Sequence, residues 1–311
     1  MRRAKVPVIG LIPESRRALP GFDVMADGSA TEDSQGPVSS LVYDDNYFRH
    51  ECEGHEEFVA SGGQILSTRL MEALTRADVR PGMHVLDAGC GRGESLVWLG
   101  SRQVEAWGVD YSAAALHLAA GALSQADPAA QSAGGSPLFS ALRPPRGQGG
   151  RLLSANVRQL PFAAQAFDRV LMLDIVEHLH PSELRQALKE AWRVLKPGGK
   201  LLVHTAPNLW YYLYGYPAFR LFERLRGVPL PHDPRDRFRY HRQVHVNEQS
   251  PTMLRRALRD AGFRPRIWLA DIQRRWADRG RLACILGWLA THAYPFRWVF
   301  CGDILGEARK D

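Results

Sequence analysis

Residues 83–93 read MHVLDAGCGRG, and this stretch decides the fold. Its first six residues suit an apolar strand, which runs directly into a turn with glycine at positions 89, 91 and 93. Glycine lets the chain turn tightly and lets a ligand approach the backbone closely. A helix is predicted to follow at 95–99, and a helix N-terminus favours an anionic group. The order of strand, turn and helix therefore predicts a ligand site at the turn.

The alternation of strands and helices continues along the chain. Strands are predicted at 83–88, 104–109, 152–153, 167–173, 200–205, 266–270 and 298–306, and helices at 95–99, 113–122, 181–195 and 251–261. Because the strands are apolar throughout, both faces of the sheet need to be covered by helices, which is typical of a doubly wound α/β fold with a mainly parallel sheet. Ligands of such a fold bind beyond the carboxyl ends of the strands, where the strand order reverses.

Three segments lie outside this alternation. Residues 1–42 show no sustained period and predict a flexible arm. Residues 121–150 contain 20 Ala, Gly, Pro or Ser in 30 positions, which predicts a flexible insertion. Residues 43–80 are expected to form helix, because apolar residues recur there at steps of three to five positions along one face. These apolar residues are Ile65, Leu66, Leu70, Leu74 and Val79.

Composition excludes several classes of protein. The chain has 311 residues, 45% hydrophobic and 23% charged, so it can bury a sizeable core and is not a wholly disordered protein. Its four cysteines are scattered, which argues against a disulfide scaffold or structural zinc site and favours a reducing compartment. The most apolar stretch, 282–296, is shorter than the roughly 20 residues that span a bilayer. With no cleavage site after the first apolar run, no signal peptide is assigned, and a cytoplasmic location is expected.

The positive charge is unevenly distributed. The net charge is +7, and residues 220–281 contain 16 Arg against 7 Asp plus Glu. A basic face of this kind binds nucleic acid, an anionic membrane surface or an acidic substrate, or else it is simply a solvated arginine-rich surface. Composition does not decide among these interpretations, and no recognisable RNA-binding module accompanies the arginines.

Acidic residues around the glycine turn favour a cationic ligand over a dinucleotide. The dinucleotide fingerprint is GxGxxG, whereas the spacing here is GxGxG, and Glu94 at the sixth position would repel a pyrophosphate. Asp87 stands two positions before Gly89, where it suits a cation. Asp110 ends the next predicted strand, where a carboxylate can accept both ribose hydroxyls. S-adenosylmethionine, with a sulfonium, an ammonium and no phosphate, fits these residues better than NAD; a tight turn with a surface Asp is the alternative.

Further motifs follow the glycine turn VLDAGCGRG at 85–93. They are NVRQLPF at 156–162, FDRV at 167–170, DIVEHL at 174–179 and RVLKPGGKLLV at 193–203, with HVNEQS at 245–250 and DILGEARK at 303–310 toward the end of the chain. Together these motifs resemble those of class I S-adenosylmethionine-dependent methyltransferases of the type 11 subgroup, which includes the methyltransferases of ubiquinone and menaquinone biosynthesis. The last two resemble the tail of the same fold.

The resemblance implies a Rossmann-like sheet of seven strands, mainly parallel, with an antiparallel terminal strand. It implies a methyltransferase domain over 43–311, with a cofactor-binding core at 83–206 and an acceptor-binding or lid region at 207–262. It also implies which residues contact S-adenosylmethionine, namely Asp87, Ala88, Gly89, Cys90, Gly91, Gly93, Asp110, Tyr111, Asn156, Val157 and Asp174. The family usually has Asp where this chain has Asn156, whose amide oxygen can still accept from the adenine amino group.

The candidate catalytic residues follow the strand at 167–173. Asp174, Glu177 and His178 are spaced i, i+3 and i+4, so one helical turn is expected to bring them to a common face. Methyl transfer needs alignment, and it needs a general base only when the acceptor is protonated. The three side chains suit a base or acceptor-orienting role, a divalent metal site such as the similar DxxEH arrangement of some quinone and small-RNA methyltransferases, or a structural cap. These roles stay open, and no metal is assigned from the sequence.

Residues 210–222 contain seven aromatics in thirteen positions, just after the strand at 200–205. This pattern predicts a pocket or lid for an apolar or aromatic acceptor, or else an amphipathic helix packed on the core. Together with the arginine excess, residues 209–226 also suit peripheral contact with a membrane surface. Among the nearby histidines, His245 is the best placed for acceptor contact, because it begins the HVNEQS segment.

We therefore expect an enzyme that moves a methyl group from S-adenosylmethionine to a small acceptor, at oxygen or carbon, by in-line displacement. Two alternatives are a metal-assisted RNA 2′-O-methyltransferase and a non-catalytic protein that binds S-adenosylmethionine. An NAD-linked oxidoreductase is disfavoured by the glycine spacing. No obligatory protein partner is expected from the sequence.

Overall fold

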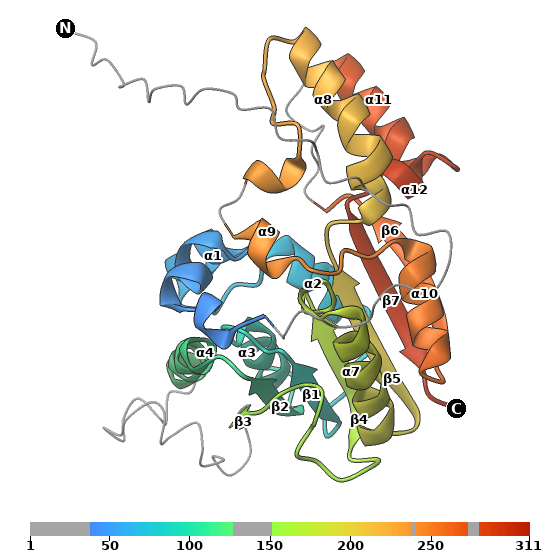
Figure 1. Ribbon diagram of the computed structural model, residues 1–311. Coiled ribbons are helices and arrows are strands. Elements are labelled where there is room, and N and C mark those ends of the chain that lie inside the picture. The colour runs from blue at the N-terminus through green and yellow to red at the C-terminus, as the bar shows by residue number, and fades with distance from the viewer. Residues whose placement is uncertain (1–37, 127–150, 238–239, 273–279) are drawn as a thin grey trace, which may run out of the picture. The chain divides into compact units, whose positions relative to one another are not determined.

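The computed structural model describes residues 38–126, 151–237, 240–272 and 280–311, which lie in one compact unit that extends from Gly36 to Asp311 (Figure 1). Residues 1–37 of the predicted arm and 127–150 of the predicted insertion lie outside the described residues. Among the described residues, no helix is long and apolar enough to cross a membrane.

Seven strands form one sheet. They are β1 (His84–Ala88), β2 (Glu105–Asp110), β3 (Arg151–Ser154), β4 (Phe167–Leu173), β5 (Leu195–Thr205), β6 (Arg264–Ala270) and β7 (Asp303–Arg309). Their order is β3-β2-β1-β4-β5-β7-β6; the first five are parallel, and β7 runs antiparallel to both β5 and β6. The predicted fold class is thus confirmed. The order reverses between β1 and β4, so their carboxyl ends lie side by side at the place where such sheets bind ligands.

Helices cover both faces of the sheet. Those of the described residues are α1 (His55–Ser61), α2 (Thr68–Thr75), α3 (Glu94–Gly100), α4 (Ala113–Ala126), α7 (Pro181–Val194), α8 (Tyr216–Leu225), α9 (His241–Val244), α10 (Pro251–Asp260), α11 (Arg281–His292) and α12 (Arg297–Phe300). Short 3-10 or π turns are η1 (Ser40–Val42), η2 (Tyr47–Glu51), η3 (Val176–His178), η4 (Tyr211–Gly215) and η5 (Pro234–Arg237).

The two faces of β4 show how the apolar strands hold these layers together. Val170 and Met172 belong to a core cluster with α7 and α10, whereas Leu171 and Leu173 belong to a second cluster with α2, α3 and α4. Successive side chains of a strand point to opposite faces, so a strand that is apolar at every position supplies both cores. This is why the sheet lies between two helical layers.

Local signals fix where α7 and α10, which share one core cluster, begin. At the start of α7, the backbone N–H of His180 donates to Glu183 Oε2 at 3.0 Å, and Pro181 occupies the first turn. At the start of α10, Ser250 Oγ accepts from the N–H of Met253 at 3.2 Å. Both helices therefore begin where the sequence predicts.

The prediction of one helix over 43–80 is wrong. This stretch contains η2, α1 and α2 as separate elements, and Ile65, expected on a buried face, is 60% exposed. Gly54, Gly62 and Gly63 all have positive φ, a conformation that ends a helix and that glycine adopts without strain. The apolar spacing continues across these breaks, so periodicity alone did not reveal them.

Two other boundaries differ from the prediction. Residues 121–126, assigned to the flexible insertion, continue α4 as far as Ala126. The strand predicted at 298–306 is instead the short helix α12 followed by β7, which begins at Asp303. In both places an alanine-rich or aromatic run was compatible with either structure.

Gly108 in β2 is expected to be essential for stability. An added Cβ there would lie 2.5 Å from Leu96 Cδ1 and 2.9 Å from Cys90 Sγ, so α3 packs directly on the glycine backbone. Overpacking of this kind costs about 1–3 kcal/mol, and Gly108→Ala should lower the free energy of unfolding by that amount in urea denaturation. The control is Gly121→Ala in α4, where nothing lies within 4 Å; it should gain about 0.4–1 kcal/mol. Equal stability of the two variants would contradict this packing.

Candidate active site

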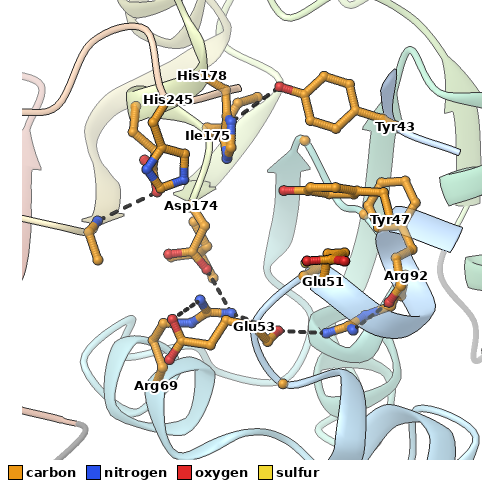
Figure 2. A pocket seen from close by; sticks show the side chains of 18 of the residues that line it. Tyr43, Tyr47, Glu51, Glu53, Arg69, Arg92, Asp174, Ile175, His178 and His245 are labelled. Carbon is orange, nitrogen blue, oxygen red and sulfur yellow. Dashed lines mark hydrogen bonds and ion pairs between the residues drawn. The ribbon is translucent and has the colours of Figure 1, made fainter. Parts of the chain in front are cut away.

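A cavity of about 500 Å³ lies at the carboxyl ends of the five parallel strands. Its wall comes from the β1–α3 turn, the ends of β2 and β4, the loop after β3, the loop and turn after β5, and the segment from Val38 to Glu57 (Figure 2). The site therefore forms where the reversal of strand order places it.

The glycine turn is held by a carboxylate from the neighbouring strand. Gly89 and Gly91 have positive φ, and a Cβ on Gly89 would lie 2.5 Å from Ile175 Cδ1. The N–H of Gly91 donates to Asp110 Oδ2 at 3.0 Å, and the N–H of Ser112 donates to Asp110 Oδ1 at 2.8 Å. Asp110 thus ties the first turn to the end of β2, and it lines the cavity.

Asp87 brings an unsatisfied carboxylate oxygen to the same wall. It is buried and accepts from Ser95 Oγ, whereas its Oδ1 has no hydrogen-bond partner in the structure. Burial raises the pKa of Asp87 to about 7. A buried carboxyl group with an open acceptor atom suits a cationic ligand, because a cation favours its charged form.

Glu94 does not act as the sequence suggests. Its Oε1 lies 2.8 Å from Nη2 of Arg92, and both side chains are buried, so its charge is balanced within the protein. The repulsion of a pyrophosphate by Glu94 is therefore not a valid argument against a dinucleotide. The same guanidinium donates to the carbonyls of Phe48 and Glu53, which attaches the N-terminal segment to the glycine turn.

Nine of the eleven predicted cofactor residues line the cavity: Asp87, Gly89, Cys90, Gly91, Asp110, Tyr111, Asn156, Val157 and Asp174. Ala88 and Gly93 are not part of the wall. Ala88 is buried in β1, and Gly93 caps α3 at a point where a Cβ would lie 2.8 Å from Ala119 Cβ. These two residues serve packing. Asn156 Oδ1 accepts from the N–H and Nε of Arg158, so this oxygen is already engaged.

Asp174 belongs to a chain of charges in which Arg69, His204 and Asp303 are buried. Arg69 Nη2 lies 3.0 Å from Asp174 Oδ2, and Arg69 Nη1 lies 3.0 Å from Glu53 Oε2. His204 Nδ1 bonds to the other oxygen of Asp174, and His204 Nε2 lies 3.3 Å from Asp303 Oδ1. Burial raises the pKa of Asp174, but Arg69 and His204 outweigh it and hold the pKa below its usual value. Burial lowers the pKa of His204, but the carboxylates outweigh it and raise the pKa to about 10.

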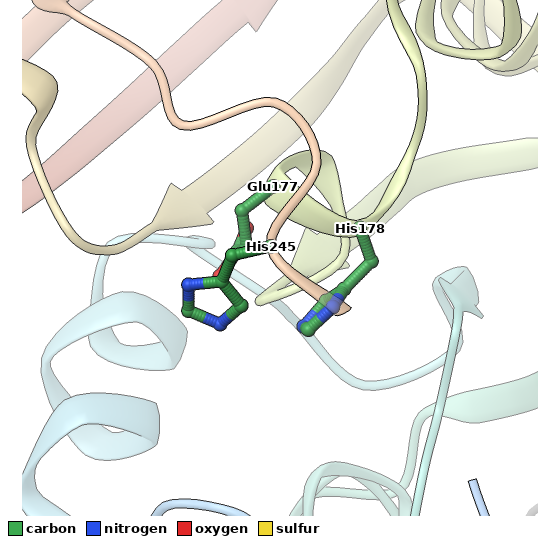
Figure 3. Close-up of side chains that lie close together, drawn as sticks. All are labelled: Glu177, His178 and His245. Atoms are coloured by element: carbon green, nitrogen blue, oxygen red, sulfur yellow. The ribbon is translucent and has the colours of Figure 1, made fainter. Parts of the chain in front are cut away.

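The predicted common face of Asp174, Glu177 and His178 is therefore wrong. Asp174 has φ +56°, and only 176–178 form a turn of 3-10 helix, so Asp174 points into the charge chain instead. Glu177 and His178 face the cavity with a third residue, His245, whose ring centroid lies 5.0 Å from that of His178 (Figure 3). Burial and the charge of Asp174 raise the pKa of Glu177, whereas burial lowers the pKa of His178 to about 4.

The sequence did not identify the segment that covers this cavity. Tyr43, Tyr47 and Phe48 are buried against each other and against the wall, and Tyr43 Oη lies 3.1 Å from His178 Nδ1 (Figure 2). Val38, part of the predicted arm, also lines the cavity. Three aromatics within six residues were a usable signal, because isolated solvated arms are poor in aromatic residues.

Comparison with known proteins identifies a methyltransferase domain within the chain. Residues 86–203 match the model of the type 11 methyltransferase domain, and this range contains the glycine turn, Asp110 and Glu177. Residues 86–203 therefore carry a methyltransferase domain of the type 11 family. The cofactor of this family is S-adenosylmethionine.

Relatives of the methyltransferase domain act on different acceptors. The chain is 29% identical to probable tRNA methyltransferase 9B of Mus musculus over 41% of this chain and 23% of that protein. It is 28% identical to erythromycin 3''-O-methyltransferase of Saccharopolyspora erythraea over 64% and 56%, respectively. It is 32% identical to the ubiquinone/menaquinone biosynthesis C-methyltransferase UbiE of Laribacter hongkongensis over 49% and 57%. The chain thus spans between 23% and 57% of the length of these relatives.

The fold is shared with solved methyltransferase structures. Geranyl diphosphate C-methyltransferase from Streptomyces coelicolor A3(2) superposes with a TM-score of 0.51 at 18% identity, over 89% of this chain and 90% of that chain. The cavity of the present chain also fits S-adenosylmethionine chemically, because it offers the open oxygen of Asp87 to a cation and glycine backbone to a closely bound ligand.

The charge chain of the methyltransferase domain predicts a characteristic pH dependence of stability. The pKa of His204 is raised in the folded state, so its stabilising contribution is complete below the unfolded value of about 6.5 and is lost as the pH rises to about 10. In His204→Gln, the free energy of unfolding should be lower at pH 6 than in the wild type. Its decline between pH 6.5 and 10 should also be less steep, by a slope that corresponds to at most about one bound proton. Urea denaturation at each pH measures both. Parallel pH profiles of variant and wild type would contradict a charged His204.

Proposed function

We propose that this protein transfers the methyl group of S-adenosylmethionine to a small apolar or aromatic acceptor by in-line displacement. The proposal rests on one observation: two chemically different groups of residues line the same cavity. Glycine backbone and the carboxylates of Asp87 and Asp110 form one part, and tyrosine side chains from η2 and η4 form the other. The first part suits the charged donor, and the second suits an acceptor with an apolar body.

The donor is proposed to lie along the carboxyl ends of β1, β2 and β3. Asp110 would accept from the ribose hydroxyls with the lone pairs that Gly91 and Ser112 leave open, and Asp87 would face the methionine ammonium. Tyr111 would flank the adenine, and Val157 would meet its ring edge. Because Asn156 Oδ1 already accepts from Arg158, we assign it no bond to the adenine.

The acceptor is proposed to contact the tyrosines. Tyr211, Tyr212 and Tyr216 line the cavity from the η4–α8 segment, and Tyr43 and Tyr47 line it from the N-terminal side. Aromatic side chains on two sides bury apolar surface and leave few polar groups to satisfy. This composition supports an apolar or aromatic ring system more than a sugar phosphate backbone.

The geometry supports alignment as the main contribution to catalysis. The methyl carbon of a sulfonium is already electrophilic, so the protein needs to hold acceptor and donor in line and to exclude water, which is worth roughly 7–11 kcal/mol at best. His178 is a poor base for a phenol, because its pKa of about 4 lies far below the phenol value of about 10. His178 and His245 are therefore proposed to orient the acceptor.

An RNA acceptor is less well supported by the described residues. Several arginines of the basic region are engaged with carboxylates: Arg235 with Asp233, and Arg242 with both Asp233 and Asp236. Such pairs reduce the positive charge available to a phosphate backbone. A tRNA methyltransferase is among the relatives, but at 29% identity over 41% of this chain it does not outweigh the aromatic wall.

The direct test of the proposed reaction uses the full-length protein and a donor labelled on its methyl group. Incubation with a fractionated small-molecule extract, followed by mass spectrometry, should show label in an apolar or aromatic product. Incubation with total RNA is the parallel arm. Label confined to RNA, or no label in any acceptor despite measurable donor binding, would overturn the proposal.

Asp110→Asn should weaken donor binding about 10- to 100-fold, because charge-assisted hydrogen bonds contribute about 1.5–3 kcal/mol each. Calorimetric titration with S-adenosylhomocysteine measures this change. The control is Glu105→Gln at the exposed start of the same strand, which should bind as the wild type does. If both variants keep wild-type affinity, Asp110 does not hold the ribose.

We propose in addition that the protein contacts an anionic membrane surface through η4, α8 and α11. Helix α11 is apolar around much of its circumference, yet Ile285, Leu286, Trp288 and Leu289 are exposed. Figure 1 shows α11 and α8 at the same end of the molecule. A shallow groove nearby is lined by Trp210 and Tyr214, at η4, and by Tyr294, Pro295, Phe296, Trp298 and Val299. Arg220, Arg224 and Arg281 supply the positive charge that anionic lipids attract. A membrane is also where apolar acceptors concentrate.

Co-sedimentation with vesicles tests this surface. Wild-type protein should pellet with phosphatidylglycerol vesicles more than with phosphatidylcholine vesicles. Trp288→Glu should reduce pelleting at least about tenfold, because one buried large apolar side chain is worth about 1.5–3 kcal/mol. Met253→Glu, exposed on α10, is the matched control and should behave as wild type. Equal binding by the two variants, or none by the wild type, would contradict the proposal.

A further inference from the structure

Three side chains with metal-ligand atoms meet at the wall of the cavity. Glu177, His178 and His245 each offer one ligand atom, and these atoms all lie within 4.8 Å of one another (Figure 3). The first two belong to η3, and the third follows α9, so they are far apart in the sequence. The N–H groups of Val246 and Asn247 both donate to the carbonyl of Glu177, at 2.9 and 3.1 Å, which fixes the loop of His245 against η3.

We propose that Glu177, His178 and His245 bind one divalent first-row transition metal ion, such as Zn²⁺ or Mn²⁺, on the acceptor side of the cavity. Two imidazoles and one carboxylate are ligands that these ions accept. Three protein ligands on one side of the ion leave positions toward the cavity for an acceptor oxygen or water.

The neighbours of His178 hold its ring in the form that a metal requires. Nδ1 lies 3.0 Å from the carbonyl oxygen of Val244, and a carbonyl can only accept a hydrogen bond. Nδ1 therefore carries the proton, and the lone pair of the neutral ring is on Nε2. A backbone carbonyl behind the ring is the usual support of a metal-bound histidine.

Glu177 has a comparable support. Thr205 Oγ1 donates to Glu177 Oε2 at 2.8 Å, which orients the carboxylate and leaves further lone pairs for a ligand bond. The cluster therefore has ordered second contacts on its carboxylate and on one imidazole. This arrangement distinguishes it from an accidental meeting of polar side chains.

The charge balance of the wall also favours a cation at Glu177. Among the described residues of the wall, the arginines are Arg69, Arg92 and Arg158. Arg69 is paired with Glu53 and Asp174, Arg92 with Glu94, and Arg158 with Glu183. Each guanidinium is thus committed to another carboxylate, whereas buried Glu177 accepts hydrogen bonds from the Thr205 hydroxyl and a backbone N–H. A buried carboxylate is stable when it is paired or coordinates a metal.

A metal here would determine the type of acceptor, and this part of the inference rests on the proposed function. A bound divalent ion lowers the pKa of a coordinated hydroxyl and holds its oxygen in place. The hydroxyl proton would leave to water, and the oxygen would then attack the sulfonium methyl carbon, so that S-adenosylhomocysteine leaves with the sulfur lone pair. The acceptor would be a hydroxyl-bearing apolar or aromatic molecule, and the product its methyl ether.

Metal binding is tested without any acceptor. Full-length protein is treated with EDTA, dialysed and titrated with Mn²⁺ by electron paramagnetic resonance, and with Zn²⁺ by calorimetry. The wild type should bind one equivalent. His245→Ala and Glu177→Gln should each bind at least about tenfold more weakly, because even partners behind the ligands are worth 10- to 100-fold. His232→Ala, an exposed histidine in the same region, is the control and should match the wild type.

Folding of the variants is checked by titration with S-adenosylhomocysteine, which should remain near the wild-type value. No Mn²⁺ or Zn²⁺ binding by the wild type, or unchanged binding by His245→Ala, would overturn the metal site. Methyl transfer that continues in excess EDTA would overturn its role in catalysis while leaving the proposed function intact. Failure to bind S-adenosylhomocysteine would instead contradict the proposed function, whatever the metal titration shows.

Discussion

The hydrogen bond from the N–H of Gly91 to the carboxylate of Asp110 is the contact on which the site depends. It joins the turn after β1 to the end of β2 and so fixes where backbone and carboxylate face the cavity. The bond is possible because the two strands are adjacent and parallel, and because glycine tolerates φ of +49° at this position. The residues proposed to place the donor are thus brought together by strand order and turn conformation.

A second constraint separates the charges of the cavity into two groups. Arg69 and His204 hold Asp174 as a charged group on the sheet side, where Asp303 completes the chain. The second group faces the cavity beyond the end of β4 and consists of Glu177, His178 and His245. Asp174 is paired with Arg69 and His204, so it does not join Glu177 as a ligand. Its negative charge nevertheless raises the pKa of Glu177. The division leaves the proposed acceptor side with two imidazoles and one carboxyl group that a cation would stabilise.

Much of the fold and of the donor site could be predicted from sequence, because both depend on local patterns. Apolar strands with Asp87, Asp110 and Asp174 at or beside their carboxyl ends define the sheet, and glycine spacing defines the turn. The acceptor side depends on long-range contacts that no local pattern contains. His245 joins Glu177 only through a loop clamped by backbone hydrogen bonds, and Asp174 leaves the predicted cluster because distant Arg69 and His204 bind it. Likewise, the apolar spacing over 43–80 did not reveal the glycines that break it.

The proposed donor site can be seen in a crystal structure of the 311-residue chain with S-adenosylhomocysteine. The ribose hydroxyls should lie within hydrogen-bond distance of Asp110, and the amino group of the ligand should face Asp87. The sulfur should point toward the side of the cavity lined by His178 and Tyr211. A saturated crystal in which the cavity holds no ligand, or in which the ribose lies away from Asp110, would contradict the proposed donor site.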